Sequence, residues 1–105
     1  MEELIIVLTT FPDEPKAKAA ARALLEAKLA ACCTLLPGTS FYWWEDRINE
    51  EAEVVMMIKT RSSLYTDLEK KLREIHPYEV PEIIALPIIK GSQNYLDWIN
   101  EVTKD

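Results

Sequence analysis

His76-Pro77-Tyr78-Glu79-Val80-Pro81-Glu82 is the stretch of this 105-residue chain from which the fold is most readily worked out. Each proline fixes its own φ at about −65° and moves the residue before it out of the helical region. The segment therefore ends a helix and leads stiffly into a strand. It also holds the only histidine of the chain beside Tyr78 and Glu79, so polar side chains able to bind a ligand have nearly fixed directions. The plainer alternative is a rigid connection without a further role.

A helix is expected before this segment and a strand after it. Ser62 or Ser63 can cap the helix, whose apolar face then follows at helical spacing (Leu64, Leu68, Leu72, Ile75). Residues 83–89 form an apolar run that predicts a strand, and Pro87 within it favours an edge position because proline donates no ladder hydrogen bond. Ser92 predicts the start of a short terminal helix with a second apolar face (Leu96, Ile99, Val102).

The N-terminal part of the chain predicts a strand followed by a helix. Residues 3–9 form an apolar run typical of a buried strand. Asp13 is a good helix cap, and Pro15 fits the first helical turn, where its missing N–H has no cost. The alanine-rich stretch that follows places apolar residues on one face until about residue 28.

The middle of the chain predicts two further strands. Residues 30–36 read as a strand that Pro37-Gly38 bends or interrupts, and extended structure resumes over residues 41–44. Asn49-Glu50-Glu51 predicts the turn into a strand over residues 53–60. The chain contains neither a repeat nor a low-complexity segment, so residues 1–105 are expected to form a single domain.

The resulting order is strand, helix, strand, strand, helix, strand and a C-terminal helix. This is the split β-α-β-β-α-β arrangement of the ferredoxin-like α+β fold, with the first and third strands in the centre of the sheet. The first, third and fourth strands are nearly continuous apolar runs, which indicates that both faces of the sheet are buried. Because the two main helices cover only one face, we expect a second subunit on the other.

Composition and charge exclude several classes of protein. Hydrophobic residues make up 49% of the chain and charged residues 29%, as in globular proteins. The formal net charge of −6 disfavours nucleic acid and anionic membranes as partners. No apolar run approaches the roughly 20 residues of a membrane span, so a cytoplasmic location is expected. The adjacent Cys32 and Cys33 are expected to be reduced thiols, at least one of them in the core.

Several segments between residue 5 and residue 98 have an order and spacing that match those of one family. They are Thr10-Phe11-Pro12-Asp13-Glu14, Leu29-Ala30-Ala31-Cys32, Tyr42-Trp43-Trp44 with Ile48, Lys59-Thr60, His76 to Ile83, and Tyr95-Leu96-Asp97-Trp98. Together they resemble the CutA family, the divalent-cation-tolerance proteins. The histidine-proline-tyrosine and tyrosine-tryptophan-tryptophan segments are the most specific of these.

The resemblance implies a tight homotrimer with an architecture similar to the PII signalling proteins. It implies a link to copper and other divalent metals, and it implies no enzymatic reaction. It also places a turn at Glu45-Asp46-Arg47 and a long hairpin that reaches a neighbouring subunit. This chain departs from the family pattern at Thr9, where some bacterial members carry a cysteine implicated in copper binding. Since a hydroxyl is a poor ligand for soft Cu(I), this departure argues against high-affinity copper binding.

The candidate site residues follow from side-chain chemistry. His76, Glu79 and Cys32 offer nitrogen, oxygen and sulfur ligands, and together they predict weak binding of Cu(II) or another divalent cation, with no required cofactor. A cleft between subunits is expected to take a metal ion or a small ligand. Its expected lining combines aromatic, charged and polar side chains (Trp43, Trp44, Lys59, Tyr78, Glu82). One tryptophan of the pair is expected in the core, since neighbours in a strand point to opposite faces.

Two other functions stay open from the sequence. The trimer could be a structural or signalling scaffold that needs no metal. Alternatively, His76 could act as the general base of a hydrolase or transferase with Glu79 or Tyr78. The enzyme is disfavoured, because the chain has no cysteine–histidine or serine–histidine motif and no phosphate-binding loop.

Overall fold

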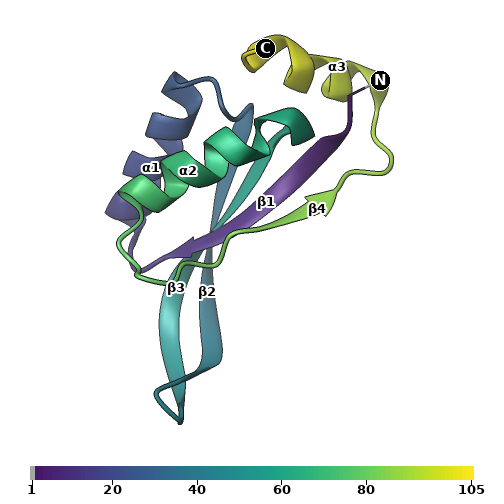
Figure 1. Cartoon of the computed structure of the whole chain (residues 1–105). Helices are drawn as coiled ribbons and strands as arrows, with labels where there is room; N and C mark the ends of the chain where they lie inside the picture. Colours follow the sequence, from purple (N-terminus) through teal and green to yellow (C-terminus); the bar gives the residue numbers. More distant parts are fainter. Residues whose placement is uncertain (1) are drawn as a thin grey trace.

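A computed structural model describes residues 2–105, which form four strands and three α-helices in two layers (Figure 1). Along the chain these elements are β1 (Leu4–Phe11), α1 (Glu14–Glu26), β2 (Cys32–Trp44), β3 (Arg47–Arg61), the short 3-10 helix η1 (Ser62–Leu64), α2 (Tyr65–Ile75), β4 (Ile84–Pro87) and α3 (Gln93–Val102). The strands pair antiparallel in the order β2-β3-β1-β4. The predicted ferredoxin-like α+β fold, with the first and third strands central, is therefore confirmed.

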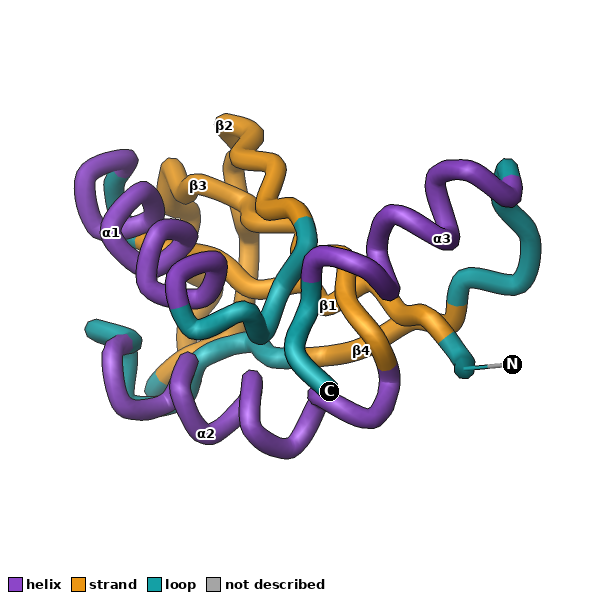
Figure 2. The backbone as a smooth tube through the Cα atoms, turned by 90° about the horizontal axis from the view of Figure 1, so that it is seen from above, coloured by secondary structure: helices purple, strands orange, loops and turns teal. Residues whose placement is uncertain are grey.

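Helices α1 and α2 lie together on one face of the sheet (Figures 1 and 2). Asp13 caps α1 as predicted, since its side chain accepts a hydrogen bond of 2.9 Å from the backbone N–H of Lys16, and Pro15 lies in the first turn. The core between helices and sheet is formed by side chains from α1, α2, β1 and β3 (Val7, Phe11, Leu24, Met56, Ile58, Leu68, Leu72). Alternate residues of the central strands thus pack against the apolar faces of the two helices, as the spacing of apolar residues in each element predicts.

Strand β2 runs without a break, contrary to the expected bend or interruption at Pro37-Gly38. Pro37 lies opposite Val54 and Gly38 opposite Glu53 in the ladder with β3. An edge strand tolerates proline, because only one of its sides needs hydrogen-bond donors. A β-carbon at Gly38 would come within 3.2 Å of a methyl group of Val55, so glycine avoids a tight contact with that side chain.

The turn of the long hairpin lies at Glu45-Asp46, so the turn expected at Asn49-Glu50-Glu51 is wrong. Glu45 and Asp46 both have positive φ, 52° and 61°, as a two-residue hairpin turn of the primed type requires. Asn49 belongs to β3, and its side-chain amide donates to the carbonyl oxygens of Trp44 and Arg47 at 3.3 and 3.2 Å. Asn49 therefore carries a true turn signal, but it supports a turn that lies a few residues before it.

Three further boundaries differ from the sequence-based expectation. Neither Ser62 nor Ser63 caps α2, because both belong to the 3-10 turn that precedes it. Leu64 takes the cap position without a side-chain hydrogen bond. Ser92 precedes α3 as predicted, although its side chain makes no capping bond within the described residues. Strand β4 is shorter than the apolar run of residues 83–89, because it ends where its pairing with β1 ends.

The second face of the sheet is apolar and largely uncovered in the single chain. Helix α3 covers only one end of it, where Ile99 packs against Leu4 and Ala31. Beyond this end, large apolar side chains of the strands stay exposed, including Leu36, Ile84 and Leu86 at 47, 50 and 48%. Apolar character on both faces was the sequence-based reason to expect a partner chain, and this open face fits that expectation.

Candidate functional site

His76 ends α2 and is fixed by contacts on three sides. Its backbone is extended, with φ −77° and ψ 134°, as expected for a residue before proline. The imidazole stacks on Phe11, with ring centroids 4.4 Å apart, and Nε2 lies 3.2 Å from the hydroxyl of Thr9. Nδ1 accepts a hydrogen bond of 3.1 Å from the backbone N–H of Tyr78. Both ring nitrogens are therefore engaged within the chain.

These contacts select one form of the imidazole. Because Nδ1 accepts a hydrogen bond, the proton of the neutral ring is on Nε2, which donates to Thr9. Burial lowers the pKa of His76 and outweighs the opposing effects of a hydrogen bond to the backbone of Thr10 and of the Glu53 charge. The ring is thus held neutral, but a metal ion would have to displace one of its hydrogen bonds.

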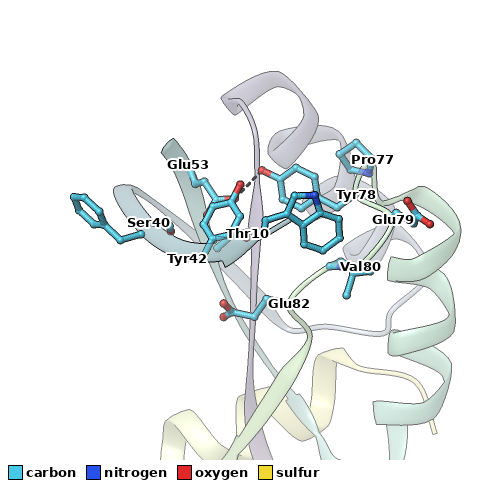
Figure 3. Close-up of a pocket in the computed structure, with 12 residues that line it drawn as sticks. Thr10, Ser40, Tyr42, Glu53, Pro77, Tyr78, Glu79, Val80 and Glu82 are labelled. Carbon is cyan, nitrogen blue, oxygen red and sulfur yellow. Dashed lines mark hydrogen bonds between the residues drawn. The ribbon is translucent and has the colours of Figure 1, made fainter. Parts of the chain in front are cut away.

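Two tyrosine–glutamate pairs lie next to this loop. The hydroxyl of Tyr78 donates to Glu53 Oε2 at 2.6 Å, which ties the loop after α2 to strand β3 (Figure 3). Tyr42 on β2 donates in the same way to Glu51. Burial and the hydrogen bond to Glu53 raise the pKa of Tyr78, and the hydrogen bond to Glu51 raises that of Tyr42. Both phenols therefore stay protonated and both glutamates act as acceptors.

A cleft of about 720 Å³ opens between the hairpin, the start of the loop and the end of β1. Figure 3 shows Glu53 and Tyr78 facing each other across its upper side, with Glu79, Val80 and Glu82 from the loop along the other side. The full lining is Thr10, Ser40, Phe41, Tyr42, Trp44, Glu53 and residues 77–82. Its volume lies in the range of small-molecule sites, which are commonly about 300–1,000 Å³.

Four of the predicted site residues line this cleft: Trp44, Tyr78, Glu79 and Glu82. Trp43 does not, and both tryptophans are exposed, at 72% for Trp43 and 47% for Trp44, so the expectation that one lies in the core is wrong for the single chain. The hairpin extends beyond the helical layer, which leaves its tip without a core to enter (Figure 1).

Lys59 and Cys32 lie elsewhere, on the open face of the sheet. They are directly opposite each other in the β2–β3 ladder, and Lys59 Nζ is 5.9 Å from the ring centroid of Tyr95. His76 contacts residues of the helix-covered face, so one chain does not bring Cys32 to it. The neighbouring Cys33 points into the core, where burial and the nearby Cys32 raise its pKa to about 12.

Within residues 2–105, no three histidine, cysteine, aspartate or glutamate side chains lie close enough to hold a metal ion. The predicted ligands His76, Glu79 and Cys32 therefore do not form a complete metal site in one chain. Binding to a single histidine with one carboxylate is weak, since stable sites commonly use three or four protein ligands.

The sequence analysis missed the cleft residues that come from the sheet, above all Glu53 and Tyr42. A signal for Glu53 was present, because Glu51 and Glu53 are two apart in a strand and so point to the same face. Their partners Tyr42 and Tyr78 lie 9 and 25 residues away in the sequence, and no local pattern connects them.

Comparison with known proteins agrees with this fold and with these motifs. Residues 5–102 match the family model described as CutA1 divalent ion tolerance protein. The chain belongs to this family. A divalent-cation tolerance protein CutA from Thermus thermophilus is 44% identical over 98% of this chain and 99% of its own length. Protein CutA of Homo sapiens is 51% identical over 90% of this chain, which spans only 54% of that relative.

Solved structures of the family superpose closely. The CutA structure from Archaeoglobus fulgidus, described as a periplasmic divalent cation tolerance protein, has a TM-score of 0.94 and 38% identity, covering 96% of this chain and 99% of its own. The resemblance inferred from the sequence motifs is thereby confirmed. None of the helices formed by residues 2–105 has the length and apolar character needed to cross a bilayer.

Proposed function

We propose that this protein takes part in the cellular response to divalent metal ions as a cytoplasmic homotrimer. The match to the divalent-ion tolerance family over residues 5–102 carries this proposal. The open apolar face of the sheet supports the assembly, because a second chain would remove Leu36, Ile84 and Leu86 from water. In the trimer, the cleft beside the loop of residues 76–82 lies at a subunit boundary and serves as the binding site.

A divalent cation such as copper binds weakly at this loop, with His76 as the principal ligand and Glu79 as the second. The imidazole gives up its hydrogen bond to Tyr78 or to Thr9 when it binds the metal, and this cost keeps the affinity modest. Cys32 completes the ligand set only from a neighbouring chain, because in its own chain it lies on the other face of the sheet.

Calorimetric titration with Cu(II) and Zn(II) tests this proposal. His76→Ala and His76→Gln should each lower the affinity at least about tenfold, the second without leaving a cavity beside Phe11. The surface control Glu101→Gln, at an exposed position of α3, removes a carboxylate far along the chain from the loop and should bind as the parent does. Lowering the pH below the ordinary imidazole value of about 6.5 should weaken binding as well, because burial lowers the pKa of His76 and its protonation then competes with the metal.

A scaffold trimer without a physiological metal is the second candidate. It is favoured by the engaged imidazole, which has a complete structural role without any ion. Unchanged metal affinity and stoichiometry in both His76 variants would select this alternative and reject the metal site.

A hydrolase that uses His76 as general base is a weaker candidate. The hydroxyl of Thr9 is the group that faces Nε2 at 3.2 Å, but Thr9 is fully buried, so a substrate carbonyl cannot reach it without rearrangement of the core.

A further inference from the structure

The cleft beside the loop carries negative charge that the chain leaves uncompensated. Glu53, Glu79 and Glu82 line it, and its lining contains no lysine, arginine or histidine. None of the ion pairs formed by residues 2–105 includes any of these three carboxylates. Glu53 is oriented by the hydroxyl of Tyr78 on Oε2, and no hydrogen bond from the described residues reaches its other oxygen. An oriented acceptor thus faces the cleft.

Four aromatic residues also line the cleft. Phe41, Tyr42 and Trp44 come from β2, and Tyr78 comes from the loop. An aromatic ring has a negative face that attracts a cation, with a contribution of about 0.5–1 kcal/mol at exposed sites. Carboxylates with aromatic faces favour an organic cation, whose charged ends meet the glutamates while its methylene groups cover the rings.

We infer that this cleft binds an aliphatic diamine or longer polyamine. Glu53 receives one ammonium group from the sheet side, and Glu82, which Figure 3 shows below Glu53, receives another from the loop side. The alkyl chain between the two groups lies against Tyr42 and Trp44. The inference rests on the proposed function only in using the same cleft as a binding site.

Other ligand classes fit these walls less well. An anion would meet three carboxylates, and like charges at close range disfavour binding. A bare divalent ion needs several oxygen or nitrogen ligands at once, and residues 2–105 bring no three such side chains together. A long flexible cation differs because its charges can reach carboxylates that lie apart. The loop prolines Pro77 and Pro81 keep the site preorganised, which lowers the entropy lost on binding.

Spermidine titration of the 105-residue chain at about 0.15 M salt, where charges are screened beyond about 8 Å, tests the inference. We expect saturable binding, measured by calorimetry and by tryptophan fluorescence, to which Trp44 contributes with Trp43 and Trp98. Glu53→Gln should lower the affinity about tenfold or more, because it removes a charge-assisted hydrogen bond but keeps an oxygen for Tyr78. Trp44→Leu should also weaken binding, whereas Glu101→Gln changes the net charge equally and should not.

Several outcomes would overturn the inference. These are the absence of saturation, an equal loss of affinity in Glu101→Gln and Glu53→Gln, or equal binding of the dianion succinate. Circular dichroism and sedimentation of each variant show whether it is folded and assembled like the parent. Zn(II) titration of the same samples separates the two proposals. Parent protein that binds Zn(II) but not spermidine would reject the polyamine site. Parent protein that binds spermidine but shows no His76-dependent Zn(II) binding would reject the metal site.

Discussion

At the scale of single residues, His76 shows how a reactive side chain can have a structural role. Its ring closes α2, stacks on Phe11 and connects β1 to the loop through Thr9 and Tyr78. The same contacts place the hydroxyl of Thr9 where a metal-binding side chain would have to be. The chemistry of this pair therefore depends on the residue at position 9.

Thr9→Cys should create a stronger Cu(I) site. The thiolate would lie beside Nε2 of His76, in place of a hydroxyl that is now 3.2 Å away, and soft Cu(I) prefers sulfur and imidazole nitrogen. A Cu(I) titration against a chromophoric competitor should show a gain of at least about tenfold over Thr9→Ser, the matched oxygen variant. Adding His76→Gln to Thr9→Cys should reverse most of the gain. Equal Cu(I) affinity in the cysteine and serine variants would contradict this.

The lowered pKa of His76 predicts a specific loss of stability with acid. The unfolded chain takes up a proton near the ordinary pKa of about 6.5, before the folded chain does, so the free energy of unfolding falls as the pH drops through that value. Denaturant unfolding at several pH values between about 7.5 and 5 should show this slope. In His76→Gln the slope should be smaller. The acidic groups Glu2 and Asp13, whose pKa values are lowered, lose their contribution only at lower pH.

At the scale of elements, the β2–β3 hairpin is the feature most exposed to solvent and least explained by its own chain. It turns at two acidic residues in the left-handed region, and Asn49 braces the turn from β3. Phe41 and Ile48 near its tip are 66 and 63% exposed. Near its tip this hairpin has little packing beyond the pairing of its own two strands, so the conformation of the turn contributes to its stability.

Asp46→Gly should stabilise this hairpin. Asp46 has a φ of 61°, which glycine adopts without steric cost, and the gain should be roughly 0.5 kcal/mol after the greater freedom of the unfolded glycine is subtracted. Denaturant unfolding at one fixed protein concentration measures it. The control Glu50→Gly, in the extended part of β3, should be destabilising instead. A loss of stability in Asp46→Gly would show that the turn does not carry this strain.

At the scale of the whole molecule, one face of the sheet is covered by its own helices and the other is open. The helix-covered face contains the core, and the open face keeps Leu36, Ile84 and Leu86 in contact with water. Arg61 connects the two ends of the chain, since its guanidinium donates to Thr103 and lies 3.8 Å from a carboxylate oxygen of Glu2. The two ends of the chain are thus held together by Arg61, whereas one face of the sheet stays largely uncovered in the single chain.

Leu86→Glu should disrupt the assembly of the chains. Leu86 pairs with Ile6 on the open face, and a buried carboxylate at a subunit interface would be costly. Sedimentation at micromolar concentration should show three times 12.1 kDa for the parent and a smaller mass for this variant. Leu25→Glu is the matched control, because Leu25 is similarly exposed at 41% but lies on α1, and it should keep the parent mass. A parent mass of one chain would refute the trimer.

Much of the fold was predictable because its signals are local. Asp13 and Pro15 start α1, His76 before Pro77 ends α2, and the apolar periods set the order of strands and helices. The errors fell where tertiary pairing overrides a local signal. The ladder with β3 carries β2 through Pro37-Gly38, and it moves the hairpin turn away from Asn49.

The sequence by itself determined the family, the ferredoxin-like order of elements and the stiff loop of residues 76–82, because each depends on short motifs and on spacing along the chain. Only the tertiary structure decided what the loop faces. It separated Cys32 and Lys59 from His76 by placing them on the other side of the sheet, and it joined Tyr78 to Glu53, which is 25 residues earlier in the sequence. The cleft is lined by segments that are distant in the sequence, so its lining depends on how the strands pair. A shift of one residue in strand register would turn each side chain of the strand to the other face of the sheet.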